Sequence, residues 1–199
     1  MSESGAFNEQ LEEVSTVELL TELKRRYRVL QRPEGSVLLL GPPAAGKHTQ
    51  AKFVRAEFGL CGLDGDKVKA ENNTMETLKR ISDQLQHPRC RRGFVITGFP
   101  SNAEEASSFE KMLQVDFPDK AIFNDYKVVE LVAEDAKTLA ERAAVKDNFG
   151  ARLNAWVSGK GALFSQNPRF ARRREVDATK STEDVSRQIF DYLSTPGKP

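Results

Sequence analysis

Short continuous runs of apolar residues alternate along the chain with longer stretches in which apolar positions recur every three or four residues. The continuous runs are typical of strands buried on both faces of a parallel sheet, and the longer stretches predict amphipathic helices. Such runs predict buried strands at residues 36–40 and 93–97, and two further strands are predicted at 127–132 and 172–176, which also contain charged residues. The predicted helices span 15–31, 47–58 and 74–86, then begin at 101, and finally cover the stretches around 139–145, 149–156 and 185–193. Strands that alternate with helices predict an α/β domain of three layers, with a parallel sheet between helices.

An additional amphipathic helix precedes this pattern. Ser15 and Glu18 have the spacing of a capping box at its start, and the Pro-Glu-Gly segment at 33–35 ends it. Its leucine and tyrosine side chains fall on one face, and the basic residues at 24–26 lie on the other side. The helix either covers the flank of the sheet or docks a partner protein. The chain is divided accordingly into a flexible N-terminus (1–14), the additional helix (15–35), the α/β domain (36–194) and a flexible C-terminus (195–199).

The composition excludes several classes of protein. Thirty Lys and Arg residues against 29 Asp and Glu leave almost no net charge, which argues against nucleic acid or a membrane as a partner. The two cysteines, Cys61 and Cys90, are too few for a disulfide framework or a zinc site, so we expect both to be buried apolar residues in a reducing compartment. No apolar run reaches membrane-spanning length, and the acidic N-terminus lacks a signal core. The sequence therefore predicts a soluble, cytoplasmic protein.

The segment GPPAAGKHTQ at 41–50 is the strongest candidate for chemistry. It lies between a predicted strand and a predicted helix, which is the context of a phosphate-binding loop. Gly41 and Gly46 let backbone N–H groups converge on an anion, and the helix that follows adds its positive N-terminal end. Lys47 places a positive charge against the β- and γ-phosphates of a nucleotide. The alternative is a tight turn with an exposed lysine, and the flanking elements argue against it.

The position of the threonine hydroxyl in this segment makes the prediction of a phosphate-binding loop more specific. Thr49 stands two residues after Lys47, and the resulting Gly-x-Pro-x-x-Gly-Lys-x-Thr-Gln resembles the loop of the adenylate kinase family of nucleoside monophosphate kinases. The resemblance implies a P-loop kinase fold and an ATP-binding loop made of Gly41, Pro42, Pro43, Ala44, Ala45, Gly46, Lys47, His48, Thr49 and Gln50. The family has glycine where Ala44 and His48 stand. Ala44 is tolerable if its φ is negative, and His48 either crowds the nucleotide or, as we expect, points to solvent.

Three further segments carry the resemblance through most of residues 36–194. The segment GDKVKAE at 65–71 resembles the one that contacts AMP, with Lys69 in place of an arginine, and GFVITGFPSNAEEA at 93–106 resembles a second AMP-contacting segment. The helix at 135–142 resembles the one whose last arginine lies against the ATP base, which gives Arg142 that role. The implied AMP-binding residues are Asp66, Lys69, Gly98, Phe99, Pro100 and Glu105.

The sequence departs from the family at residues that the resemblance makes catalytic. Thr97 replaces the aspartate that orients hydrated Mg²⁺, and Ser101 replaces an arginine that grips the AMP phosphates. Glu105 replaces a glutamine that reads the AMP base, and a carboxylate accepts but does not donate hydrogen bonds. Phosphoryl transfer depends on positioning and charge neutralisation, so these losses predict weak catalysis.

The lengths of two segments also depart from the family. The 24 residues between Lys69 and Phe94 leave no room for the usual AMP-binding subdomain, and the segment after Arg142 is too short for the usual lid. Lys146 and Arg152 are the only candidates there to supply charge. The arginine cluster at 169–174 belongs to a late strand, where we expect a solvated basic edge.

Two functions remain open. The first is an ATP:AMP phosphotransferase with weak activity or an altered acceptor, in which Lys47, Arg142 and Arg152 supply the charge and Mg²⁺ arrives with ATP. The protein itself is predicted to supply no metal site. The second is a catalytically inactive relative that serves as a structural or regulatory component of a larger assembly, through a partner at the N-terminal helix.

Overall fold

Five parallel strands form the centre of the computed structural model, which describes residues 13–70, 73–133, 136–143 and 148–195. The strands follow the order β2-β3-β1-β4-β5, and every neighbouring pair is parallel. Their bounds are β1 (Val37–Leu40), β2 (Cys61–Asp64), β3 (Phe94–Thr97), β4 (Lys127–Val132) and β5 (Arg174–Asp177). The predicted α/β class with a parallel sheet is confirmed.

The edge strand β2 is the one strand that the sequence pattern does not predict, since only a turn is expected at 62–67. Its four residues, CGLD, alternate between buried and half-buried positions. Glycine and aspartate are both depleted in strands, so this short segment carries almost no strand signal. Backbone pairing with β3 specifies the strand instead, with Cys61 opposite Phe94 and Asp64 opposite Thr97.

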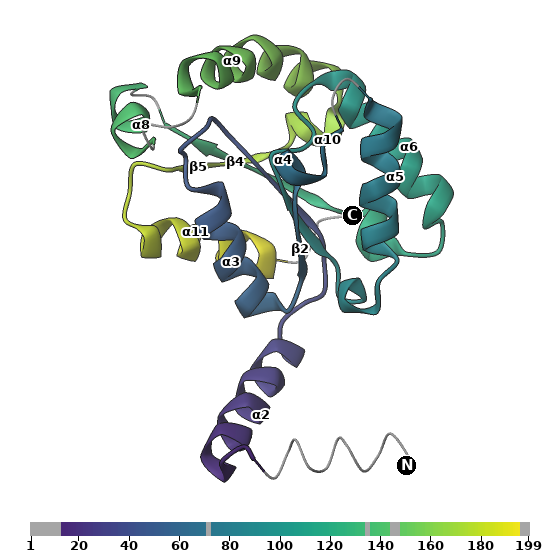
Figure 1. Ribbon diagram of the computed structural model, residues 1–199, viewed down its shortest axis with the longest axis vertical. Helices are drawn as coiled ribbons and strands as arrows, with labels where there is room; N and C mark the ends of the chain where they lie inside the picture. The colour runs from purple at the N-terminus through teal and green to yellow at the C-terminus, as the bar shows by residue number, and fades with distance from the viewer. Residues whose placement is uncertain (1–12, 71–72, 134–135, 144–147, 196–199) are drawn as a thin grey trace.

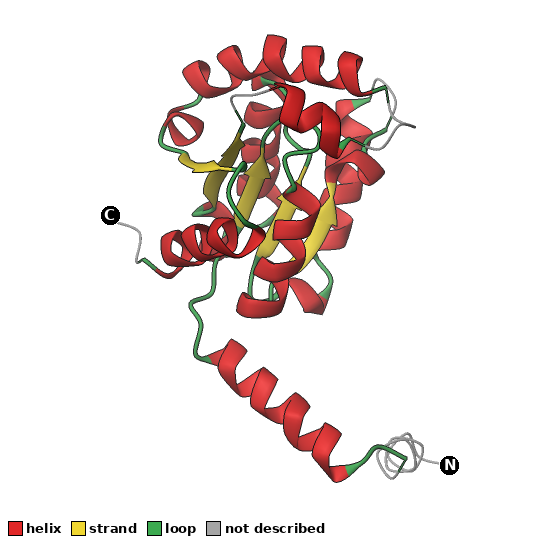
Figure 2. Ribbon diagram, turned by 90° about the vertical axis from the view of Figure 1, so that its left-hand side faces the viewer, coloured by secondary structure: helices red, strands yellow, loops and turns green. Residues whose placement is uncertain are grey.

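Helices cover both faces of the sheet (Figures 1 and 2). The longer ones are α2 (Thr16–Leu30), α3 (Lys47–Phe58), α5 (Thr74–Leu85), α6 (Ala103–Asp116), α8 (Ala136–Arg142), α9 (Phe149–Gln166) and α11 (Thr182–Ser194). Single turns form α4 (Gly65–Val68), α7 (Ala121–Asn124), α10 (Pro168–Ala171) and the 3₁₀ turn η1 (Pro88–Cys90). The predicted start at Ser101 is wrong, because Asn102 caps α6 by accepting the N–H of Glu105. None of the helices in the described ranges combines the length and apolar character needed to cross a bilayer.

Alternate residues of the central strand β1 pack into two separate cores. Leu38 and Leu40 lie in a core beneath α5, α6 and α9, which is rich in phenylalanine. Val37 and Leu39 lie in the opposite core, beneath α3 and α11. The period-two alternation of a strand sends neighbouring side chains to opposite faces, so a continuous apolar run fits a sheet covered on both sides.

A disulfide joins Cys61 on β2 to Cys90 at the end of η1, with the Cα atoms 4.8 Å apart. Both residues are buried, as expected, but the prediction that they are free is wrong. After α5 the chain returns to the sheet edge beside β2, which brings together two residues that lie 29 positions apart in the sequence. The prediction of a reducing compartment rested on free cysteines, so the disulfide removes the basis of that prediction.

Replacing both Cys61 and Cys90 with alanine should lower the free energy of unfolding by about 2–4 kcal/mol, because the bond closes a loop in the unfolded chain. Urea denaturation, followed by circular dichroism, measures this loss. Wild type with a reductant should lose a similar amount of stability. An unfolding midpoint that responds neither to the reductant nor to the double substitution would contradict the prediction.

Helix α2 extends away from the α/β body (Figures 1 and 2). Its capping box at Ser15 and Glu18 forms as predicted. Among the described residues, the contacts to the body lie at its C-terminal end: Val29 is buried, and the Arg92 guanidinium donates to the carbonyl oxygens of Val29 and Arg32 at 2.9 and 2.8 Å. Of the two alternatives for this helix, the structure contradicts the one in which it covers the flank of the sheet.

Candidate functional site

The loop at 41–46 leads from the carboxyl end of β1 into the first turn of α3. Gly41 has a φ of 141°, and a Cβ placed there would lie 2.6 Å from the carbonyl oxygen of Leu131 on β4. Gly46 has a φ of 86° and is the N-cap of α3. Both positions therefore need glycine, and the turn aims the N-terminal end of α3 across the ends of the strands. This is the geometry predicted for a phosphate-binding loop.

Of the two loop residues that deviate from the family, Ala44 contradicts its prediction and His48 does not. Ala44 has a φ of 62°, so the expected negative value is wrong. The left-handed region costs an alanine about 1–2 kcal/mol and suits the glycine that the family has there. His48 is half exposed, and its Nδ1 lies 3.4 Å from Thr97 Oγ1 and 3.8 Å from Asp64 Oδ2. The His48 side chain is thus 54% exposed, as predicted, and its Nδ1 faces the ends of β2 and β3.

Lys47 lies inside the loop rather than on its surface. Its Nζ donates to the carbonyl oxygens of Gly41 at 2.9 Å and Pro42 at 2.7 Å, and 8% of the residue is exposed. Burial lowers the pKa of Lys47 to about 8, although the negative charge of Asp66 opposes the shift. The carbonyl oxygens of Gly41 and Pro42 thus hold the Lys47 ammonium. The phosphate oxygens of a bound nucleotide would take the place of these two carbonyl oxygens.

A cavity of about 600 Å³ opens in front of the loop. Residues 43–50 line it, and so does Arg142, whose Nη1 donates to the carbonyl oxygen of Ala178 at 2.7 Å. Phe149 and Lys180 also line the cavity, and sequence reasoning missed them. The segment with Ala178 and Lys180 follows β5, so the rule that ligands bind at the carboxyl ends of parallel strands could have found it.

Gln50 and Arg152, which the sequence predicts as site residues, each hydrogen-bond to another part of the protein. The Gln50 side chain donates to the carbonyl oxygen of Thr182 and accepts from Ser186 Oγ, so it joins α3 to α11. Arg152 on α9 lines the cavity and donates to Asp66 at 3.0 Å.

Lys146 lies outside the described residues. In the 169–174 cluster, Arg173 pairs with buried Glu130, so this segment is not simply a solvated edge, and none of its residues lines the cavity.

A second cavity of about 400 Å³ lies beside the loop, where the resemblance places AMP. Its walls include Asp66, Lys69, Gly98, Pro100 and Trp156. Phe99 is fully buried in the core and does not line it.

A closed network of hydrogen bonds borders this second cavity. The buried Glu105 carboxylate accepts the N–H of Ser101 at 2.7 Å and the Ser101 hydroxyl at 2.8 Å, and its other oxygen pairs with Lys69 Nζ at 2.8 Å. Burial by itself raises the pKa of Glu105, but Lys69 and Ser101 outweigh it and hold the pKa below its usual value. The carboxylate is therefore ionised and already has its partners.

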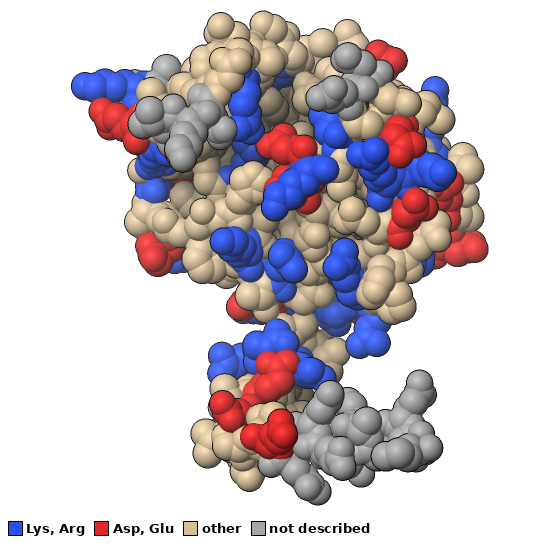
Figure 3. Space-filling model, viewed as in Figure 1, with Lys and Arg blue, Asp and Glu red and all other residues tan. Residues whose placement is uncertain are grey.

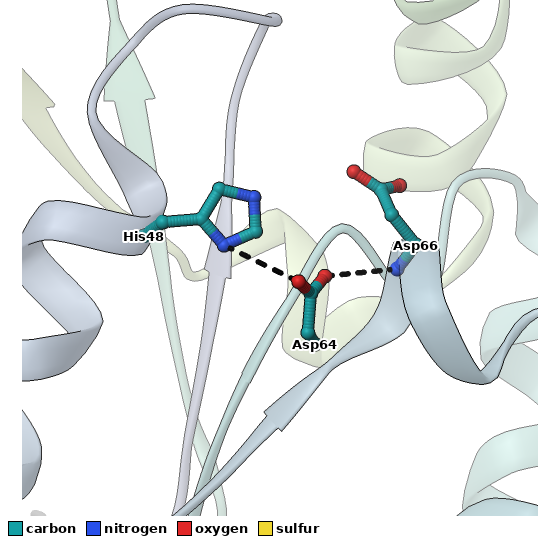
Figure 4. A group of neighbouring side chains, drawn as sticks. All are labelled: His48, Asp64 and Asp66. Atoms are coloured by element: carbon teal, nitrogen blue, oxygen red, sulfur yellow. Dashed lines mark hydrogen bonds and ion pairs between the residues drawn. The ribbon is translucent and has the colours of Figure 1, made fainter.

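Three potential metal ligands lie close together (Figure 4): His48 at the start of α3, Asp64 at the end of β2 and Asp66 in α4. Their ligand atoms lie within 4.8 Å of one another, although the sequence predicts no metal site supplied by the protein. Asp64 lies opposite Thr97 in the β2–β3 register. The carboxylate missing at Thr97 thus has a counterpart on the neighbouring strand, which sequence reasoning did not foresee.

Comparison with known proteins agrees with this geometry. No family model matches the chain. The adenylate kinase of Parvibaculum lavamentivorans is 30% identical over 191 residues, which cover 79% of this chain and 91% of that protein. The chain belongs to the adenylate kinase family. The parallel five-stranded sheet agrees with the P-loop kinase fold of this family.

Other relatives share a shorter region. Adenylate kinase 4 of Arabidopsis thaliana is 33% identical over 132 residues, which cover 56% of this chain and 54% of that protein. Adenylate kinase 3 of Oryza sativa subsp. japonica is 33% identical over 124 residues, which cover 52% of each chain. The chain thus spans about half the length of these two relatives.

Proposed function

We propose that the protein binds ATP with its phosphates on the 41–49 loop and its base beside Arg142, and that it phosphorylates AMP or another nucleoside monophosphate only slowly. The observation that carries the proposal is the buried Lys47 ammonium, held by loop carbonyls inside a strand–loop–helix turn that faces a cavity of about 600 Å³. A lysine is rarely buried without an anionic partner, and a nucleotide phosphate would be that partner.

Three cationic residues of the chain have separate proposed roles at this site. Lys47 exchanges its two carbonyl partners for β- and γ-phosphate oxygens, and the N-terminal end of α3 supplies backbone donors. Arg142 positions the base against the wall formed by Ala178. Arg152 lies between the two cavities and adds positive charge near the transferred group. These three cations are the residues that the sequence assigns to catalysis.

The donor set at the strand ends fits Mg²⁺, which prefers oxygen ligands and accompanies ATP. Asp64 and Asp66 would hold the hydrated ion, with Asp64 supplying the carboxylate that is missing at Thr97. The ion contributes neutralisation of charge on the phosphates. His48 adds a nitrogen ligand that Mg²⁺ does not need.

The residues around the cavity proposed for the acceptor nucleotide support slow phosphoryl transfer. Lys69 replaces an arginine, and Glu105 already binds its ammonium, so little positive charge is left for an acceptor phosphate. The Glu105 carboxylate is also occupied by two Ser101 donors and is not available to read a base. The same network favours the second candidate function, an inactive relative that binds ATP and acts in a larger assembly.

The pH dependence of ATP affinity tests the proposal. Phosphates bind the charged ammonium, so ATP raises the pKa of Lys47 above its value of about 8 in the free protein. The affinity should change little between pH 7 and 7.5 and should fall as the pH rises through 8, with a loss of about tenfold by pH 9. Isothermal titration calorimetry measures it.

The Lys47→Arg variant is the matched control, because an arginine stays charged throughout this range. Its affinity, whatever its absolute value, should not show the decline above pH 8. Equal ATP affinity of wild type at pH 7 and pH 9 would contradict a role for the Lys47 ammonium in phosphate binding.

A further inference from the structure

His48 is the one member of the group of potential metal ligands that the proposed function leaves unused. It lies in the first turn of α3, at a position where the family has glycine. Its Nδ1 lies 3.8 Å from Asp64 Oδ2, which is too long for a hydrogen bond, and 3.4 Å from Thr97 Oγ1. Figure 4 shows the imidazole ring and the Asp64 carboxylate facing each other. A nitrogen donor and an oxygen donor are thus directed at the same point.

The spacing of the three ligand groups fits a single cation. Zn²⁺ binds nitrogen and oxygen ligands at about 2.0–2.2 Å, so two ligands of one ion lie at most about 4.4 Å apart. The 3.8 Å between His48 Nδ1 and Asp64 Oδ2 is within this range. The ligand atoms of His48, Asp64 and Asp66 all lie within 4.8 Å of one another, so small rotations of these side chains bring all three into reach of one ion.

Both carboxylates have a basic neighbour with which a cation would exchange. Arg152 Nη2 donates to Asp66 Oδ2 at 3.0 Å, and Lys67 Nζ lies 3.9 Å from Asp64 Oδ2. Figure 3 shows acidic side chains at the position of α4 with basic side chains close by. The Arg152 and Asp66 side chains are 46% and 44% exposed, and ion pairs between exposed side chains contribute little to stability. A divalent cation therefore displaces these basic side chains at little cost.

The mixture of one nitrogen and two carboxylates selects the class of cation. Mg²⁺ prefers oxygen ligands, whereas imidazole suits Zn²⁺ and other divalent transition metals. A glycine at position 48 would leave two carboxylates, which suit Mg²⁺. His48 therefore shifts the preference of the group from Mg²⁺ toward first-row transition metals.

The group faces the cavity proposed for the ATP phosphates. His48 and Asp66 line this cavity of about 600 Å³. Burial lowers the pKa of Lys47, and the negative charges of Asp66 and Asp64 both oppose the shift, so the two carboxylates act on the ammonium that is proposed to bind phosphate. A cation held by the group would have its remaining coordination positions open toward the cavity.

We propose that His48, Asp64 and Asp66 form a site for a divalent first-row transition metal, such as Mn²⁺, Co²⁺ or Zn²⁺, which the protein binds without nucleotide and in preference to Mg²⁺. The nitrogen comes from α3, and the oxygens come from the end of β2 and from α4, so the site joins three elements. In a complex with ATP, which rests on the proposed function, the same cation would neutralise phosphate charge in place of Mg²⁺.

Calorimetric titration of the nucleotide-free full chain, without a histidine tag, with Co²⁺ and separately with Mg²⁺ tests the site. Wild type should bind one Co²⁺ at least about tenfold more tightly than Mg²⁺. His48→Ala should lose at least about tenfold in Co²⁺ affinity, since even outer-shell partners change the affinity of a metal site by about 10–100-fold, and its Mg²⁺ affinity should change little. Asp64→Asn keeps a residue that caps α4 and should weaken the binding of both cations.

His87→Ala is the matched control, because His87 is the other of the two histidines in the chain and is exposed. It should bind Co²⁺ as wild type does. Equal Co²⁺ affinity of wild type and His48→Ala would overturn the proposal. Equal affinity of wild type for Co²⁺ and Mg²⁺, or no Co²⁺ binding by the nucleotide-free protein, would also overturn it.

Paramagnetic broadening locates the bound ion. Two histidines give two sets of imidazole C–H signals in proton NMR spectra, and His87→Ala assigns them. Mn²⁺ added below an equimolar amount should broaden the His48 signals and leave the His87 signals sharp. Equal broadening of both sets would indicate adventitious binding to exposed histidines and would overturn the proposal.

Lys47→Met separates this proposal from the proposed function. The variant keeps all three metal ligands, so it should bind Co²⁺ at least as tightly as wild type. Co²⁺ binding by a wild type that does not bind ATP would support the metal site and contradict the proposed function. ATP binding by a wild type that does not bind Co²⁺ without nucleotide would overturn the metal site and leave the proposed function standing.

Discussion

Replacing Lys47 with methionine should weaken ATP binding by roughly 10- to 100-fold in calorimetric titrations at pH 7. The substitution removes a charged donor from a buried loop, and hydrogen bonds to charged groups contribute about 1.5–3 kcal/mol each. Methionine has a similar length and no charge, so it fills the space that the lysine side chain occupies between Gly41 and Pro42. The loss should therefore report on the missing charge more than on a collapsed loop.

Lys52→Met is the matched control, because Lys52 lies on the same helix and is exposed to solvent. It should bind ATP as wild type does. Circular dichroism and thermal unfolding of both variants check that the fold is kept. If wild type and Lys47→Met bind ATP with equal affinity, or if neither binds it, the loop has no phosphate-binding role and the proposed function is wrong.

The sequence predicts the elements whose signal is local and strong. The segments at 36–40, 93–97 and 127–132 are rich in apolar residues, with Lys127 and Glu130 as the charged exceptions, and each forms a central strand of the sheet within a residue of the predicted bounds. The edge strand β2 is specified by pairing with β3 and not by its own four residues. The same missing strand explains the error on the cysteines, because Cys61 meets Cys90 only once β2 joins the sheet.

The candidate site also has one part that the sequence predicts and another part that it does not. The strand–loop–helix geometry around Lys47 follows from a contiguous motif, and the structure places Arg142 in the lining of the same cavity. The roles of Asp64 and Lys180 depend on contacts between segments far apart in the sequence, which no local pattern records. Ala44 shows a different limit, since a residue type does not reveal the φ angle that its neighbours impose.

AMP phosphorylation by the wild-type protein should be at least about 100-fold slower than by the adenylate kinase of Parvibaculum lavamentivorans assayed under the same conditions. An arginine at a phosphoryl-transfer site contributes about 10³–10⁵ in rate, and Ser101 stands where the resemblance places one. Lys69, the nearest cation, is held by Glu105 instead of facing an acceptor. In the proposed function Asp64, which lies opposite Thr97, supplies the missing carboxylate, so we expect the deficit mainly on the acceptor side.

Ser101→Arg combined with Glu105→Gln should raise the residual rate by about tenfold or more in a coupled assay of ADP formation, since removing one charge-stabilising group costs about 10²–10³ in other enzymes. Ser101→Arg alone should do less, because the new guanidinium would pair with Glu105, and Glu105→Gln alone releases Lys69 without adding a cation. Glu104→Gln, on the exposed side of the same turn, is the control and should change nothing. Adding Lys47→Met to the double variant should abolish the gain, since transfer requires ATP on the loop. Brisk AMP phosphorylation by the unmodified protein would show that the Lys69–Glu105–Ser101 network opens when AMP binds and that Lys69 and Arg152 together suffice for the acceptor.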